Sequence, residues 1–347
     1  MQLRPTTHAA GMATIALLVL AAFACGGGDQ PGAKPATSGQ VKTFRIAMIA
    51  KSSTNPVFLS ARVGAERAAA ELSKTNGVEV KIDWLTPPSE DGVVQAQRIA
   101  QAVNDGDNAI LIAASDAGKV TGAIDAAVSR GVPVMMFDSD APASKRFAFY
   151  GADDVAAGRQ VMAELATQMN DTGAVAILAG NQNAPNLQKR VQGVKDEAKK
   201  HPGIHIIDTF NHIETPQDAA AEVTRAQNAN PNIRGWAMVG AWALFTPSLL
   251  RDLQATKVKM VAIDALPAEL PYVEQGLAPV LLAQPTYLWG DVSVRTIFDH
   301  VYLKKPVSER VQMDLVRVSK DNLGEWARKL RDWGFTDVDP KYLALPR

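Results

Sequence analysis

The sequence contains a single cysteine, Cys25, among its 347 residues. One cysteine excludes an intrachain disulfide framework, a cysteine-rich zinc site and a CxxC redox pair. Histidines are also few, and three of them fall on a turn and a predicted strand rather than on one helical face, so we expect no metal site. The five histidines are His8, His201, His205, His212 and His300.

An excess of charge of one sign and the common catalytic motifs are lacking as well. The chain has 36 basic and 36 acidic side chains, which argues against a strongly basic nucleic-acid-binding protein. It has no G-x-G-x-x-G, no Walker A lysine loop, no H-E-x-x-H and no G-x-S-x-G, so dinucleotide, phosphate-loop, zinc-protease and α/β-hydrolase functions lack their motifs. We therefore expect no enzyme, no cofactor and no nucleic-acid partner. An α/β enzyme of unrecognised type stays an alternative.

The first 24 residues have the pattern of an export signal. Arg4 precedes an apolar stretch at 9–24 that ends in small residues and is shorter than the ~20 residues a membrane-spanning helix needs. The following Cys25-Gly-Gly-Gly-Asp resembles a bacterial lipoprotein signal, in which the cysteine is lipidated, but Ala22 stands where such signals prefer Leu. We expect a signal peptide at 1–24, a flexible linker at 25–42, and an extracytoplasmic protein anchored to the membrane through Cys25. A plain secreted protein is the alternative.

After this leader, short strand-like runs alternate with amphipathic, alanine-rich segments. Several runs, such as AILIA at 109–113, are continuously apolar, which is typical of parallel strands covered on both faces. This order predicts an α/β fold with parallel sheets. The roughly ten β-α units are too many for one ordinary open sheet, so we expect two lobes. We expect strands at 44–50, 78–85, 109–113, 132–138, 174–179 and 257–264, and helices at 58–72, 93–103, 158–169, 186–200 and 216–227.

Polar side chains stand where these apolar runs end, and ligands of doubly wound sheets bind beyond the carboxyl ends of strands. Asp and Asn at such places also cap helices, so the prediction depends on the whole set. The set combines carboxylates, amides, a guanidinium and aromatic rings, which suits the hydroxyl groups and C–H faces of a sugar or polyol. The candidate ligand-binding residues are Asn55, Phe58, Asp138, Asp140, Asn186, Arg190, Trp242, Asp264 and Gln284.

Longer segments carry a family resemblance. They are IAMIAKSSTNPVFLSARVGAERAAAEL, AILIAASDAGKV, GVPVMMFDSDAP, YGADDVAAGR, NAPNLQKRVQGVKD, VGAWALF, VKMVAIDALP and LLAQPTYLWG, in this order. Over residues 44–318 the chain resembles the type I periplasmic sugar-binding proteins of ABC transporters, the ribose-binding-protein-like group. The resemblance implies two Rossmann-like lobes with parallel sheets, joined by three crossings, with the ligand between them. The N-terminal lobe would hold residues 43–152 and 285–314, and the C-terminal lobe residues 153–284 and 315–347.

The resemblance also implies residue roles. The Asn-Pro-x-Phe element places Asn55 and Phe58 in the site, the aspartate after the fourth strand is Asp138, and the R-x-x-G arginine is Arg190. The I-D-x-x-P aspartate is Asp264, and the glutamine at a crossing is Gln284. The chain departs from the ribose-type pattern at four places, which favours a different sugar, polyol or deoxy sugar over ribose. These departures are Ser139 in place of Arg, Ala113 in place of Asn, Ala241-Trp242 in place of Asn-Asp, and Val57 in place of a frequent aromatic.

The resulting expectation is a monomeric solute receptor that closes around one small polyhydroxylated ligand and delivers it to an ABC permease. An amine, a nucleoside or a signalling molecule is the alternative ligand, because the aspartates at 138, 140 and 264 also suit an ammonium group. A receptor coupled to chemotaxis would have the same sequence features.

Overall fold

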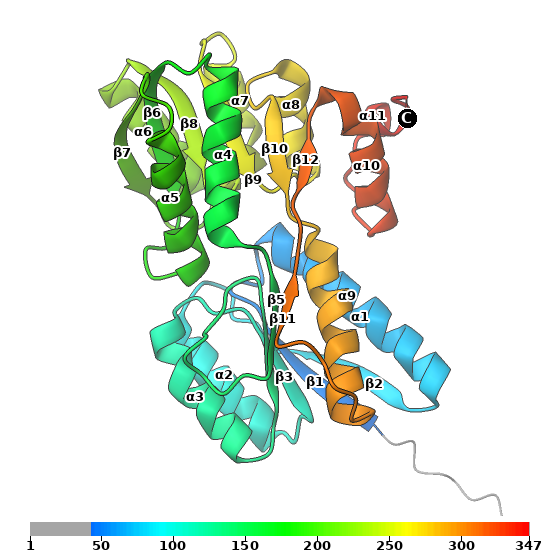
Figure 1. Ribbon diagram of the computed structural model, residues 1–347. Coiled ribbons are helices and arrows are strands. Elements are labelled where there is room, and N and C mark those ends of the chain that lie inside the picture. Colours follow the sequence, from blue (N-terminus) through cyan, green and yellow to red (C-terminus); the bar gives the residue numbers. More distant parts are fainter. Residues whose placement is uncertain (1–42, 347) are drawn as a thin grey trace, which may run out of the picture. The chain divides into compact units, whose positions relative to one another are not determined.

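The computed structural model describes residues 43–346, and the predictions for the signal peptide, for the linker and for Cys25 lie outside them. The described chain forms two six-stranded sheets, with strand orders β11-β5-β4-β3-β1-β2 and β12-β10-β9-β8-β6-β7. The two orders match position by position, so the two lobes repeat one plan (Figure 1). All strand pairs are parallel except β10 with β12. None of the helices in the described part is long and apolar enough to span a bilayer.

The N-terminal lobe consists of the first sheet and the helices on its faces (Figure 1). Its elements are β1 (Thr43–Ile49), α1 (Pro56–Asn76), β2 (Glu79–Trp84), α2 (Gly92–Asn104), β3 (Ala109–Ile112), α3 (Ala117–Ser129), β4 (Val134–Phe137), β5 (Ala148–Gly151), α9 (Thr286–Ile297) and β11 (Arg310–Gln312).

The C-terminal lobe consists of the second sheet and its helices. Its elements are α4 (Asp154–Gln168), β6 (Gly173–Ala179), α5 (Pro185–Ala198), β7 (Ile204–Asn211), α6 (Pro216–Ala229), β8 (Ile233–Met238), α7 (Pro247–Leu253), β9 (Lys259–Ile263), α8 (Leu270–Gln275), β10 (Val280–Ala283), β12 (Val316–Val318), α10 (Leu323–Asp332) and α11 (Pro340–Leu343). Short 3₁₀ turns lie at Trp242–Phe245, Pro267–Glu269 and Lys320–Asn322, and one π turn at Phe298–Tyr302 continues α9.

The chain passes from one sheet to the other three times: after β5, after β10, and between β11 and β12. The α/β fold with two lobes, predicted from the alternating runs, is confirmed. Each strand predicted from an apolar run is present with ends within two residues of the expected ones. The sequence reasoning assigned no strand to residues 148–151, although β5 lies there next to β4.

Glycines let one helix pair pack closely in each lobe. A Cβ on Gly64 of α1 would lie 2.0 Å from the Tyr287 carbonyl oxygen of α9, and one on Gly158 of α4 would lie 1.9 Å from the Arg190 carbonyl oxygen of α5. Since real Cβ atoms do not approach a carbonyl oxygen this closely, no larger residue fits at either place. In the second pair, the missing Cβ of Gly158 lets α4 approach the backbone of Arg190 in α5.

Candidate functional site

A small cavity of about 20 Å³ lies between the two lobes. Eight of the nine candidate residues line it, from the N-terminal lobe, the C-terminal lobe and the second crossing. Its lining is Lys51, Asn55, Val57, Phe58, Asp138, Asn186, Leu187, Arg190, Glu214, Gly240, Trp242, Asp264, Gln284 and Trp289. We call this the inner cavity.

Local sequence explains how the first lobe presents its residues. Asn55 caps α1 through its side chain, which accepts a hydrogen bond of 3.1 Å from the Val57 amide, and Pro56 occupies the first helical turn, where its missing N–H costs nothing. Phe58 lies one turn further on and stacks on Trp289 of α9, with ring centroids 5.9 Å apart. The capping that favours Asn55 structurally therefore also fixes its place in the cavity wall.

Arg190 is the buried cation at the centre of the site. Its Nε donates to Asp154 Oδ1 at 2.9 Å, its Nη2 to Gln284 Oε1 at 2.9 Å and its Nη1 to the Val239 carbonyl at 3.1 Å. Asp138, from the other lobe, lies 3.7 Å from Nη2. Burial raises the pKa of Asp154 to about 6, although Arg190 opposes this rise. Arg190 thus supports the fold as well as facing the cavity.

Two aspartates end equivalent strands of the two lobes. Asp138 follows β4 and Asp264 follows β9, and both have left-handed backbones with φ of 54° and 93°. Asp138 Oδ1 accepts from Asn186 Nδ2 across the lobes at 3.1 Å, and Asp264 Oδ1 accepts from Gln284 Nε2 at 2.8 Å. Burial raises the pKa of both carboxyls. Polar side chains that line the cavity therefore form hydrogen bonds with each other, and this explains why the inner cavity has so little free volume.

The ninth candidate, Asp140, does not line the inner cavity. Its two carboxylate oxygens accept bonds of 2.5 and 2.9 Å from Arg146 Nε and Nη2. The main chain turns after Asp138, where the Ser139 amide lies 2.5 Å from the Phe137 carbonyl oxygen. Asp140 consequently faces a guanidinium of its own lobe.

Among the polar and aromatic residues that line the inner cavity, sequence reasoning missed three: Lys51, Glu214 and Trp289. Lys51 comes directly after the apolar run that forms β1, so a search for polar residues at the ends of apolar runs, which selected Asp138, could have found it. Lys51 is only 2% exposed. Burial lowers the pKa of Lys51, but the carboxylates of Glu90, Glu214 and Asp138 more than offset this effect and raise it. Trp289 has a buried indole N–H that donates to no described residue.

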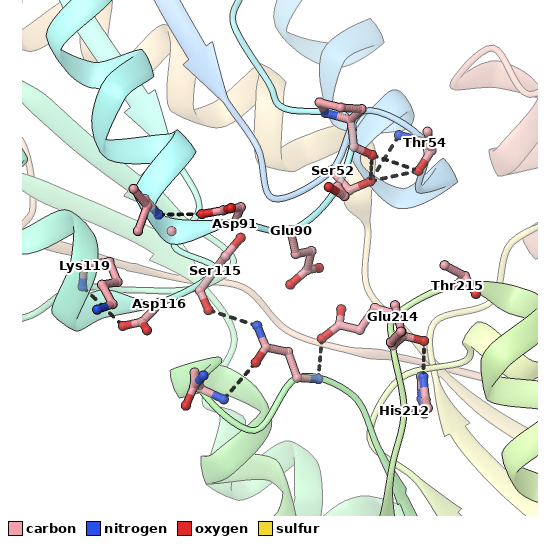
Figure 2. Close-up of a pocket in the computed structure, with 17 residues that line it drawn as sticks. Ser52, Thr54, Glu90, Asp91, Ser115, Asp116, Lys119, His212, Glu214 and Thr215 are labelled. Carbon is pink, nitrogen blue, oxygen red and sulfur yellow. Dashed lines mark hydrogen bonds between the residues drawn. The ribbon is translucent and has the colours of Figure 1, made fainter.

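A larger cavity of about 530 Å³ lies beside the first one, and we call it the outer cavity. Residues of both lobes line it, and Glu214 lines both cavities. In Figure 2 the side chains of Glu90 and Glu214 point toward one another across it. Trp242 of the inner cavity contacts His212 of the outer one edge to face, at 5.1 Å between ring centroids.

Two largely parallel sheets with a cavity lined by polar side chains of both lobes are the architecture of a two-lobed α/β binding protein. A model of the periplasmic binding protein domain matches residues 46–305, and the chain belongs to that family. This is a family of binding proteins, in agreement with the expectation that the chain is not an enzyme.

The relatives are distant and differ in ligand. The ribose import binding protein RbsB of Bacillus subtilis is 27% identical over 63% of this chain and 66% of its own length. The xylitol-binding protein of Mycolicibacterium smegmatis is 25% identical over 59% of this chain and 58% of its own length. The chain thus spans about two thirds or less of these relatives. A solute-binding protein of Burkholderia graminis, in complex with D-arabinose, has a TM-score of 0.75 and 24% identity over 81% of this chain and 97% of its own, which shows the shared fold.

Proposed function

We propose that the protein is an extracytoplasmic solute receptor that binds a small sugar or polyol in the inner cavity. The observation that carries this proposal is the convergence of Asp138, Arg190, Asp264 and Gln284 on one buried cavity with contributions from both lobes. Carboxylates accept hydroxyl hydrogen bonds, and the guanidinium and amide donate to hydroxyl and ring oxygens. The names of the relatives, for ribose and xylitol, support the same ligand class.

Ligand binding would replace side-chain hydrogen bonds that join the two lobes in this structure. A sugar hydroxyl placed between Asp138 and Asn186 replaces their direct contact of 3.1 Å with two contacts through the ligand. The indole N–H of Trp289 gains an acceptor, and the rings of Phe58 and Trp242 offer apolar faces to the sugar C–H groups. Ligand contact with both lobes shifts an open–closed equilibrium toward the closed form.

The cellular role follows from the same proposal. The closed receptor, a monomer, hands its ligand to an ABC permease, and lipidated Cys25 keeps it near that partner. Replacing Cys25 with Ser should move the protein from the membrane fraction to the soluble extracytoplasmic fraction of cells. An unchanged membrane fraction would rule out the lipid anchor without affecting the ligand site.

Calorimetric titration tests the ligand class. The panel contains D-ribose, D-xylose, D-arabinose, D-allose, D-glucose, D-galactose, xylitol and D-glucitol, with adenosine and putrescine as members of other classes. We expect at least one sugar or polyol to bind with a micromolar or lower Kd. Binding of adenosine or putrescine alone would overturn the proposal.

Matched variants then test the site. Asp264→Asn keeps the size and tolerates the left-handed backbone, but it removes a carboxylate; we expect at least a hundredfold weaker binding. Asp140→Asn removes a carboxylate that bonds to Arg146 instead, and we expect no more than a twofold change in affinity. Equal losses in the two variants would contradict the assignment of the inner cavity.

A further inference from the structure

The outer cavity contains buried polar atoms that no described residue satisfies. The hydroxyl of Ser115 and Nε2 of His212 are buried and make no hydrogen bond within residues 43–346, and the buried carboxyl of Glu90 has the Glu214 carboxylate as its partner. All three residues line the cavity. Because a buried polar atom without a partner costs about 1–3 kcal/mol, several such atoms around one cavity indicate a place where a ligand supplies the partners.

Two of the cavity's carboxyl groups come from opposite lobes and face each other (Figure 2). Glu90 follows β2 in the N-terminal lobe, and Glu214 follows β7 in the C-terminal lobe. The Glu214 carboxylate is held in place, since its Oε1 accepts from the Asn181 amide at 2.8 Å and it packs over Gly180, where a Cβ would lie 2.5 Å from Oε1. The pair is therefore a fixed feature of the space between the lobes.

The other charged groups at this cavity are already engaged or distant. Asp91 and Asp116 cap α2 and α3 by accepting from Val93 and Lys119 amides, and the Lys119 side chain lies at the same rim. Lys51 lines the inner cavity together with Glu214, and its positive charge opposes the rise in the pKa of Glu90 and lowers the pKa of Glu214. One buried cation thus serves two carboxyl groups.

The protonation of the pair agrees with this shortage of positive charge. Burial raises the pKa of Glu90 well above its ordinary value, and the Glu214 carboxylate adds to that rise. Burial also acts against the charged form of Glu214, but Lys51, Glu90 and the Asn181 amide outweigh it and lower the pKa of Glu214. Burial therefore favours the protonated form of Glu90, whereas the surroundings of Glu214 favour its charged form.

We propose that the outer cavity binds an ammonium group of the ligand between Glu90 and Glu214, while the sugar or polyol part of the same ligand occupies the inner cavity. An ammonium group carries three donors and a positive charge, whereas a hydroxyl group satisfies one acceptor and leaves the charge unbalanced. The positive charge of a bound ammonium group would lower the pKa of Glu90 and so favour release of a proton from this carboxyl to solvent. Glu214, which lines both cavities, allows one ligand to reach both. The inference rests on the proposed function of the inner cavity and makes the ligand an amino sugar or an amino polyol.

The test uses chemically matched ligands with the full-length receptor. D-Glucose is compared with D-glucosamine and N-acetyl-D-glucosamine, D-galactose with D-galactosamine and its N-acetyl form, and D-glucitol with 1-amino-1-deoxy-D-glucitol. Titrations at pH 7 in two buffers of different ionisation enthalpy give the affinity and the number of protons released. The variants are Glu90→Gln, Glu214→Gln and, as a control, Asp116→Asn, which removes a charge from the same rim but keeps a capping residue.

We expect at least one amine to bind tenfold or more tightly than its neutral partners and to release a fraction of a proton. Glu90→Gln and Glu214→Gln should reduce this preference to twofold or less, Glu90→Gln should abolish the proton release, and Asp116→Asn should keep both. Neutral binding equal to or tighter than amine binding, or a preference that survives Glu90→Gln, overturns this inference and leaves the proposed function standing. Ca²⁺ binding that Glu90→Gln removes would assign the pair to a metal instead. Failure of every sugar, polyol and amine overturns both proposals.

Discussion

Arg190→Met is the most informative perturbation of this molecule, because it measures how much a residue of the inner cavity contributes to the stability of the fold. The guanidinium makes three hydrogen bonds of 2.9 to 3.1 Å, to Asp154, Gln284 and the Val239 carbonyl. Methionine fills similar space without a charge. Removing one partner of a buried ion pair costs about 3–5 kcal/mol, so we expect the free energy of unfolding to fall by about 4 kcal/mol at pH 8.

The loss of unfolding free energy in Arg190→Met should depend on pH, because the neighbouring Asp154 can take up a proton. In the native protein its pKa is raised to about 6, so its protonated form is favoured by folding, and its contribution to stability is lost as pH rises from its unfolded value of 3.8 through about 6. Without Arg190 the native pKa rises further, and at pH 5 the carboxyl takes up a proton instead of being buried as an anion. We expect the loss at pH 5 to be smaller by about 2 kcal/mol.

Urea denaturation followed by tryptophan fluorescence at pH 5 and pH 8 measures these values. Asp154→Asn and the double variant Arg190→Met/Asp154→Asn complete a cycle, and the double variant should recover about 2 kcal/mol at pH 8 because no buried anion is left beside the methionine. A loss below about 1 kcal/mol at both pH values, or a double variant no better than the single one, would refute the structural role given to Arg190.

Two further predictions concern packing and a second buried carboxyl. Gly158→Ala should lower the free energy of unfolding by about 1–3 kcal/mol, because its Cβ would lie 1.9 Å from the Arg190 carbonyl oxygen. The control is Gly122→Ala, whose Cβ would have nothing within 4 Å, and it should leave the free energy of unfolding unchanged or raise it by up to about 1 kcal/mol. Equal urea midpoints for the two variants would contradict the close contact between the helices. Glu269→Gln should raise the melting temperature at pH 8 more than at pH 5, since burial raises the pKa of Glu269 well above its ordinary value and wild type loses stability as pH rises toward that value. A melting-temperature change that is the same at both pH values would show that Glu269 does not titrate between them.

The fold was predictable because its central strands are continuous apolar runs. Runs such as Ala109–Ile112 and Val134–Phe137 are fully buried, and a chain segment with no polar side fits only the middle of a covered sheet. The edge strand Ile204–Asn211 mixes His, Asp and Thr with apolar residues and is partly exposed, so its pattern is weaker. Glu214 follows this strand, and it was missed because the end of the strand was not recognised.

The lining of the candidate site was predictable where a polar residue ends an apolar run, as at Asp138 and Asp264. The position of Asp140 was not, because its partner Arg146 lies six residues further along the chain and the turn between them directs the carboxylate away from the cavity. Trp289 lies inside a helix whose buried face holds other apolar residues, so nothing in its spacing distinguishes a cavity wall from core. Whether a residue such as Asp140 or Trp289 lines the cavity depends on side-chain contacts in the folded chain. The spacing of apolar residues along the sequence does not reveal these contacts.

The left-handed backbones of Asp138 and Asp264 have a consequence for engineering this protein. Each non-glycine residue at such a φ costs about 1–3 kcal/mol, and glycine would relax both positions. A library screened for heat resistance alone should therefore accumulate Gly at 138 and 264 and lose the ligand binding proposed for these aspartates as it gains stability. Selection that alternates heating with ligand capture should retain both aspartates and find its gains elsewhere in the chain.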